Sequence, residues 1–164
     1  MLKLTQKDRI LIRRLRKATT QTEQRRILRA NAKKIGEGAD RLVYHTSTRS
    51  GVVFKYSRSS DSNEMEWHRY SVWKVCGKLR LARQLRIRFA EVRPITDTVS
   101  IQEYAPLESF MRSRTWYKNV ELKDERSAQM SETLKRHAGI YIDDLHCYNW
   151  SDYKNWTVIF DFAD

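Results

Sequence analysis

The decisive stretch reads Ile142-Asp143-Asp144-Leu145-His146-Cys147-Tyr148-Asn149-Trp150, followed shortly by Val158-Ile159-Phe160-Asp161-Phe162-Ala163. Apolar residues flank each polar group in it, which a loop that served only solubility would not need. Asp144 can orient or deprotonate a hydroxyl group, whereas Asn149 and Asp161 offer the hard oxygen atoms that Mg²⁺ prefers. The pattern therefore predicts a site that combines an acid–base residue with a metal ion.

A glycine-containing turn lies upstream, at Gly36-Glu37-Gly38. Glycine has no Cβ atom, so such a turn lets backbone N–H groups approach the phosphate groups of a ligand. After an expected hairpin comes Lys55, directly behind Val52-Val53-Phe54, where a lysine is poorly placed for plain solvation. These features predict a phosphate site in which Lys55 neutralises charge. The alternative is an ordinary turn and an edge-strand lysine that points outward.

A buried lysine of this kind needs an anionic partner, and the helix expected over residues 63–78 offers two glutamates. Glu66 shares a helical face with Tyr70, at i+4, so it is expected to face the core. Glu64 lies on a different face. We predict that Glu66 pairs with Lys55, with the alternative that both glutamates are ordinary surface residues.

In this order the motifs resemble the protein-kinase superfamily over residues 34–164. Asp144 and Asn149 have the D-L-x-x-x-N spacing of its catalytic loop, and Asp161 opens a D-F-x triplet. The resemblance implies catalytic roles for Asp144, Lys55 and Glu66, and metal binding by Asn149 and Asp161.

The resemblance also implies an ATP site. Gly36 and Gly38 are similar to the glycine-rich loop over the phosphates, and Val43 would cover the base. The segment Gln102-Glu103-Tyr104-Ala105 resembles the hinge between lobes. There the carbonyl group of Glu103 and the N–H group of Ala105 would contact adenine. The implied cofactors are ATP and Mg²⁺.

The chain departs from the typical pattern in three places. Ile142-Asp143 stands where protein kinases have His-Arg, and the Asp-Leu-His form resembles aminoglycoside and other small-molecule kinases and some phage-encoded kinases. Switching by phosphorylation is therefore not expected. Ala163 replaces a glycine, which leaves the metal-binding side chain intact. The sequence stops at Asp164, as in minimal kinases of bacteria, phages and bacterial effectors, so peptide recognition by the usual groove is not expected.

The implied fold class is α+β. It is a two-lobed protein-kinase-like fold with a small antiparallel N-lobe sheet and a much reduced helical C-lobe, preceded by basic N-terminal helices. Thr20 and Glu23 have the Thr-x-x-Glu form of a helix capping box. The expected division is a basic helical arm over 1–33, an N-lobe with hinge over 34–105, and a minimal C-lobe over 106–164. Periodicity predicts helices over 5–33, 63–78 and 123–137, and strands over 42–44, 52–56, 89–92, 99–104, 140–142 and 156–160.

Positive charge is concentrated at the start of the chain. The 164 residues carry a net charge of +12, and residues 1–34 hold 12 basic and 2 acidic side chains. The other 20 basic and 18 acidic residues nearly cancel. Such an arm attracts an acidic protein, a nucleic acid or an anionic membrane surface. The alternatives are a solvated helical face, or helices whose apolar side packs on the core.

The cysteine pattern and the hydropathy of the sequence indicate the cellular location of the protein. Cys76 and Cys147 form no CxxC pattern, and no stretch reaches the roughly 20 apolar residues of a membrane span. These features predict a cytoplasmic protein with no membrane span. A zinc site at His137, His146 and Cys147, or a thiol nucleophile at Cys147, lacks the usual spacing or partners.

Three functions remain at this point. The first is an ATP/Mg-dependent phosphotransferase that acts on a protein or small-molecule hydroxyl. The second is a pseudokinase or binding module whose basic arm engages an acidic protein or a nucleic acid. The third is a nucleic-acid-binding inhibitor without ATP, in which the ordered motifs would be coincidental. The phosphate acceptor, the partner and the oligomeric state are left open.

Overall fold

The computed structural model describes residues 2–38, 40–47, 49–76, 84, 86–105, 116–143, 145–146, 148–153 and 155–161. The chain divides into two compact units. The first comprises Met1–Trp67 and Glu91–Tyr104, and the second comprises His68–Ala90 and Ala105–Asp164. Asp144, the predicted acid–base residue, lies outside the described residues.

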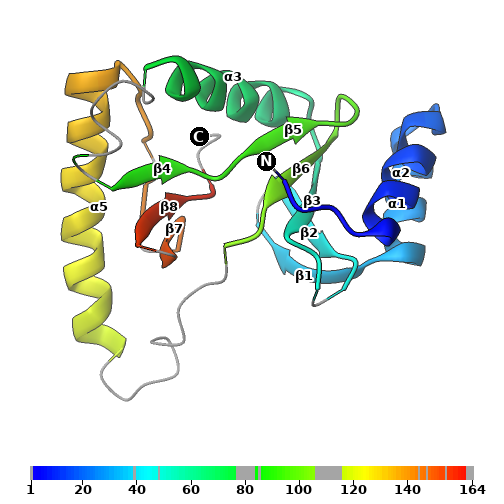
Figure 1. Cartoon of the computed structure of the whole chain (residues 1–164), viewed down its shortest axis with the longest axis horizontal. Helices are drawn as coiled ribbons and strands as arrows, with labels where there is room; N and C mark the ends of the chain where they lie inside the picture. Colours follow the sequence, from blue (N-terminus) through cyan, green and yellow to red (C-terminus); the bar gives the residue numbers. More distant parts are fainter. Residues whose placement is uncertain are drawn as a thin grey trace. The chain divides into compact units, whose positions relative to one another are not determined.

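A five-stranded antiparallel sheet forms the centre of the first unit (Figure 1). Its order is β1-β2-β3-β6-β5, so β3 has a neighbour on each side. Every residue of β3 is buried, as its run of apolar and β-branched residues would lead one to expect. The strands are β1 (Lys33–Glu37), β2 (Arg41–His45), β3 (Val52–Ser57), β5 (Val92–Pro94) and β6 (Val99–Glu103).

Two short helices, α1 (Gln6–Lys17) and α2 (Gln21–Asn31), precede this sheet. The sequence placed a capping box at Thr20, and Thr20 does cap α2 by accepting from the N–H of Glu23 at 3.2 Å. The Glu23 carboxylate reaches one residue further back, to the N–H of Thr19. A complete capping box is present in α1, where the Thr5 and Asp8 side chains each accept from the other residue's N–H group. This box was not predicted from the sequence.

The apolar sides of α1 and α2 pack against the sheet. Leu11, Leu15 and Leu28 are buried and belong to the same core cluster as Tyr44 and Phe54 of the sheet. Packing of the apolar side on the core, one of the alternatives that the sequence left open for these helices, is observed. Attraction of an acidic partner stays a prediction. Their arginines and lysines lie mostly on the exposed face.

A buried carboxylate ties α1 to the turn between β2 and β3. Asp8 is fully buried and accepts hydrogen bonds from the N–H of Thr5 at 2.7 Å, from Thr46 Oγ1 at 2.5 Å and from Ser50 Oγ at 3.0 Å. Because a buried charge is costly without such partners, this contact fixes where α1 meets the hairpin.

The second unit contains a three-stranded sheet of order β4-β8-β7. The strands are β4 (Ile87–Phe89), β7 (Trp150–Tyr153) and β8 (Trp156–Ile159), and β4 runs parallel to β8. Helix α5 (Trp116–Ala138) belongs to this unit, and Ser127 on it accepts a hydrogen bond from the indole of Trp150 at 2.7 Å. Helix α3 (Asp61–Cys76) contributes residues to both units.

Two predicted strands are wrong. Residues 89–92 do not form one strand, because Ala90 donates its N–H to Ile159 in one sheet while Glu91 accepts from the N–H of Glu103 in the other. Residues 140–142 form no strand either. Ile142 is buried, and its carbonyl accepts from Ser131 of α5, so a helix rather than a strand supplies its partner.

No helix in the described ranges combines the length and apolar character needed to cross a bilayer.

Substituting Leu15→Ala should test whether the basic helices support the core. Leu15 is fully buried, so we expect the free energy of unfolding to fall by about 2–5 kcal/mol in urea titrations. Ile10→Ala on the same helix is the matched control, because Ile10 is 40% exposed and should cost about 1 kcal/mol or less. If both variants lose the same small amount of unfolding free energy, α1 contributes little to the stability of the fold.

Candidate functional site

Of the two glycines of the predicted phosphate site, Gly36 lies in β1 and Gly38 lies in the turn between β1 and β2. The N–H of Gly38 donates to the carbonyl of Arg41 at 2.9 Å, which closes the turn. A Cβ atom built on Gly38 would meet nothing within 4 Å, and one on Gly36 would make only ordinary contact with Val43 at 3.6 Å. Neither glycine has a positive φ angle. Packing and backbone conformation therefore do not explain them, and close approach of a ligand remains the physical reason to consider.

Lys55 lies in the middle of the sheet. It stands on β3 between Val43 of β2 and Ser100 of β6, and only 4% of it is exposed. The alternative of an outward-pointing lysine on an edge strand is therefore wrong. Its Nζ donates to Oε1 of Glu66 at 2.7 Å.

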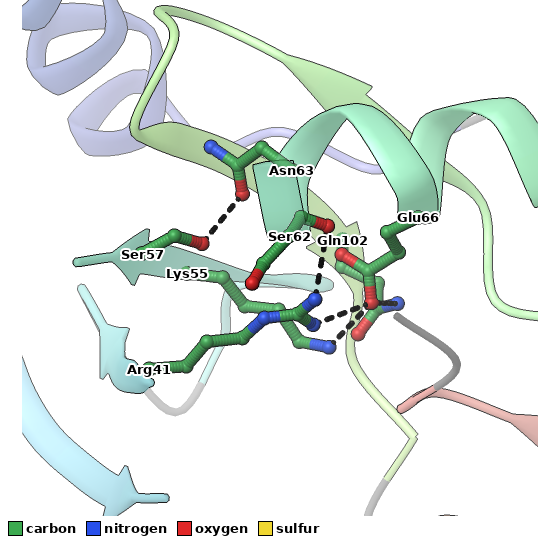
Figure 2. A network of polar contacts seen from close by, with 7 residues as sticks. All are labelled: Arg41, Lys55, Ser57, Ser62, Asn63, Glu66 and Gln102. Atoms are coloured by element: carbon green, nitrogen blue, oxygen red, sulfur yellow. Dashed lines mark hydrogen bonds and ion pairs between the residues drawn. The ribbon is translucent and has the colours of Figure 1, made fainter. Parts of the chain in front are cut away.

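Glu66 brings helix α3 onto the sheet (Figure 2). It is fully buried, whereas Glu64 on the same helix is exposed, as the helical periodicity predicted. Three donors meet at its Oε1 atom: Lys55 Nζ at 2.7 Å, Arg41 Nη1 at 3.0 Å and Gln102 Nε2 at 3.3 Å. Its Oε2 atom is buried and has no hydrogen-bond partner among the described residues. One carboxylate thus connects three strands with one helix.

Hydrogen bonds around the start of α3 hold this carboxylate in place. The Ser57 hydroxyl donates to Oδ1 of Asn63 at 2.9 Å, and Asn63 Nδ2 donates to the carbonyl of Asp97 at 3.1 Å. Asn63 therefore bridges the end of β3 and the turn before β6; Figure 2 shows its contact with Ser57. Since Glu66 follows one helical turn later, its direction is determined by this anchor.

The sequence reading missed Arg41 and the side chain of Gln102. Arg41 is the first residue of β2, is 7% exposed, and also donates from Nη2 to the carbonyl of Ser62 at 3.0 Å. A signal for it was present, because the pattern G-x-G-x-x-G-x-V has a glycine where this chain has Arg41. Gln102 was considered only as part of a hinge segment.

The predicted adenine-contacting residues lie on β2, at the end of β6 and just beyond it. Val43 of β2 is half-buried beside Gly36. Glu103 ends β6, and its own N–H donates to the carbonyl of Glu91. Ala105 is buried and belongs to an apolar cluster of the second unit with Ala90 and Val158. The adenine contacts themselves remain predictions.

The two predicted metal ligands are neighbours in the second unit. The carbonyl of Asn149 accepts from the N–H of Phe160 at 2.9 Å and from the N–H of Asp161 at 3.3 Å. The N–H of Asn149 donates to the carbonyl of His146 at 3.0 Å. Backbone hydrogen bonds just after β8 thereby bring together the main chains of two residues that stand 12 positions apart in the sequence.

Comparisons with known proteins show the fold. No protein-family model and no curated protein matches this sequence. A gentamicin complex of APH(2")-IIa has a TM-score of 0.51 at 12% identity, over 100% of this chain and 71% of that one. The likeness confirms the predicted α+β, kinase-like fold class with its antiparallel sheet.

Two further solved structures are similar at a lower score. A streptomycin-ATP-APH(2")-IIa ternary complex has a TM-score of 0.49 at 12% identity, over 90% of this chain and 72% of that one. A complex of Rv3197 from Mycobacterium tuberculosis with erythromycin has a TM-score of 0.47 at 13% identity. The match covers 94% of this chain and 54% of that one.

Glu66→Ala should destabilise the protein strongly. It leaves Lys55 and Arg41 buried without their shared carboxylate, so we expect a loss of about 3–5 kcal/mol of unfolding free energy. Glu64→Ala is the matched control on the exposed face of the same helix and should change stability by about 0.5 kcal/mol or less. Chemical denaturation measures the free energy of unfolding of both variants. Similar losses in the two would mean that the Glu66 carboxylate is not important for stability.

Proposed function

We propose that this protein is an ATP- and Mg²⁺-dependent phosphotransferase that transfers a phosphate group to a hydroxyl group. The observation that carries the proposal is the buried Lys55–Glu66 pair on the central strand, behind a glycine turn that packing does not require. A buried lysine costs free energy unless it is paired. A phosphate-binding role gives this arrangement a purpose that fold stability alone does not.

In this proposal each group of the first unit acts on the nucleotide. Lys55 neutralises phosphate charge, and Glu66 holds the ammonium group in position. The backbone at Gly36 and Gly38 approaches the phosphates, where a side chain would interfere. Val43 and Glu103 of this unit, and Ala105 of the second unit, are proposed to contact the base.

The second unit supplies the metal ligands. In this proposal Asn149 and Asp161 offer an amide and a carboxylate oxygen, and the backbone hydrogen bond between the two residues supports assigning them to one site. This hard oxygen set fits Mg²⁺. When bound, the ion neutralises charge on the phosphate oxygens.

Asp144 is proposed as the acid–base residue. It accepts the proton of the acceptor hydroxyl as that oxygen forms a bond to the terminal phosphorus of ATP. The bond between this phosphorus and the bridging oxygen breaks, and ADP leaves with the electron pair.

The acceptor is the least constrained part of the proposal, because one fold hosts many substrates. The structure with the TM-score of 0.51 is a gentamicin complex. Small hydroxyl-bearing molecules are therefore the first acceptors to test, followed by protein hydroxyl groups. A cytoplasmic location stays a prediction.

A second candidate function is a binding module that engages an acidic protein or a nucleic acid. The observation that favours it is a groove of the first unit bordered by four arginines, three of them from α1. The arginines are Arg9, Arg13, Arg16 and Arg93, over an apolar floor that includes Leu4, Ile12 and Ile101. Such a surface attracts polyanions at long range. In this reading ATP binds without phosphate transfer.

ATP with Mg²⁺ should raise the melting temperature of the wild-type protein. A ligand at 100 times its Kd stabilises the folded state by about 2.7 kcal/mol. Lys55→Met should remove most of the shift, whereas Lys33→Met, an exposed lysine of the same sheet, should retain it. An unchanged melting temperature of the wild type at saturating ATP/Mg²⁺ in several buffers would refute the nucleotide site.

Asp161→Asn and Asp144→Asn should have different effects. We expect Asp161→Asn to abolish metal-dependent nucleotide binding, while Asp144→Asn retains binding and loses phosphate transfer. Isothermal titration and a radiolabelled ATP assay measure the two quantities. Asp143→Asn is the matched control because Asp143 adjoins Asp144 and is exposed. An equal loss of nucleotide affinity in both variants would contradict the assigned roles, and binding without any transfer by the wild type would favour the second candidate function.

A further inference from the structure

Arg41 is a buried charged residue to which the roles above assign nothing. Its guanidinium group forks between two acceptors of helix α3. Nη1 donates to Oε1 of Glu66 at 3.0 Å, and Nη2 donates to the carbonyl of Ser62 at 3.0 Å (Figure 2). Only 7% of the residue is exposed. A group so costly to bury calls for a reason.

The position of Arg41 in the glycine turn is the first part of that reason. In the pattern G-x-G-x-x-G-x-V, Gly36, Gly38 and Val43 occupy their expected places and Arg41 occupies the third glycine position. Its carbonyl closes the turn with the N–H of Gly38. The side chain therefore starts from the turn that the proposed function assigns to phosphates.

The second part is the proximity of two cations. Lys55 Nζ and Arg41 Nη1 donate to the same oxygen atom of Glu66, so the two nitrogen atoms are close neighbours. Like charges at short range repel each other in a protein interior; Glu66 Oε1 already relieves part of this repulsion, and further anionic oxygen atoms beside the two cations would relieve more of it. A phosphate group offers several such oxygens, and the planar fork of a guanidinium group matches them geometrically.

We propose that Arg41 is a second phosphate-contacting cation, which binds the di- or triphosphate tail of the nucleotide beside Lys55. When the nucleotide binds, the guanidinium group exchanges its contacts with Glu66 and Ser62 for phosphate oxygens. Glu66 retains Lys55 and Gln102 as donors. This inference rests on the proposed nucleotide site and specifies how that site recognises phosphate.

The exchange is favourable for a physical reason. Of the acceptors that Nη1 and Nη2 contact on α3, the Ser62 carbonyl is neutral, whereas phosphate oxygen atoms are anionic and can accept two parallel hydrogen bonds from the planar guanidinium group. The competing interpretation is that Arg41 only tethers the glycine turn to α3. The two interpretations predict different changes in ligand affinity when Arg41 is substituted. If Arg41 contacts phosphate, the loss of affinity depends on how many phosphate groups the ligand carries; if Arg41 is only a tether, it does not.

The test compares adenosine, AMP, ADP and ATP, each with Mg²⁺, and tripolyphosphate as a probe without adenine. Isothermal titration gives the Kd of each for the wild type and for Arg41→Met. We expect Arg41→Met to raise the Kd of ATP, ADP and tripolyphosphate by about 10- to 100-fold and to leave the Kd of adenosine unchanged. Arg49→Met is the matched control, since Arg49 is exposed at the opposite end of the β2–β3 hairpin and its loss should change no affinity.

A second variant keeps the test independent of folding defects. Arg41→Gln removes the charge but keeps a polar side chain in the buried site, and it should show the same loss in the ratio of the ATP and adenosine Kd values, which a general loss of stability does not change. If the substitutions weaken the binding of adenosine and of ATP equally, or weaken neither, the inference is overturned and Arg41 is a tether only. If the wild type itself binds none of the five ligands, the proposed function fails, and this inference fails with it.

Discussion

The carboxylate of Glu66 is the interaction on which the first unit depends. Its Oε1 atom accepts from Arg41 on β2, Lys55 on β3 and Gln102 on β6, so one oxygen atom links three strands to helix α3. A buried ion pair adds little net stability, because desolvation offsets most of the attraction. Removing one partner is costly, however. Placements of α3 that separate Glu66 from Lys55 and Arg41 are therefore disfavoured.

A second buried carboxylate has a similar effect at the other end of the same hairpin. Asp8 joins the start of α1 to the turn between β2 and β3 through Thr46 and Ser50. The sheet and the basic helices also share an apolar core, in which Leu15 and Phe54 are fully buried. The hairpin is thus held at both ends by polar contacts and along its length by packing. This explains how helices with so much positive charge remain part of the fold.

The site chemistry follows from where polar groups interrupt this core. Lys55 and Glu66 occupy positions that an apolar pair would fill at lower cost, and fold stability does not account for them. Asn149 and Asp161 meet where β8 ends, as a consequence of backbone hydrogen bonding. Likeness to the gentamicin complex of APH(2")-IIa shows the fold, and a fold by itself does not determine a reaction. The proposed transfer of phosphate therefore depends on the chemistry of these particular side chains.

The sequence by itself determined the features that depend on local periodicity. The 3.6-residue period of α3 turned Glu66 rather than Glu64 inward, and the apolar run before Lys55 indicated a buried strand. Thr20 was identified as a helix cap for the same local reason. The kinase-like α+β fold class also followed, because the motifs stand in their expected order.

Only the tertiary structure decided the features that depend on distant partners. A charged residue such as Arg41 is expected to be exposed, and it is buried because Glu66, 25 positions later, supplies an acceptor. Residues 89–92 divide between two sheets, since strand pairing is chosen by segments far along the chain. Local patterns indicate which face of an element is apolar. They do not reveal what that face will meet, because that depends on contacts that form only when the whole chain folds.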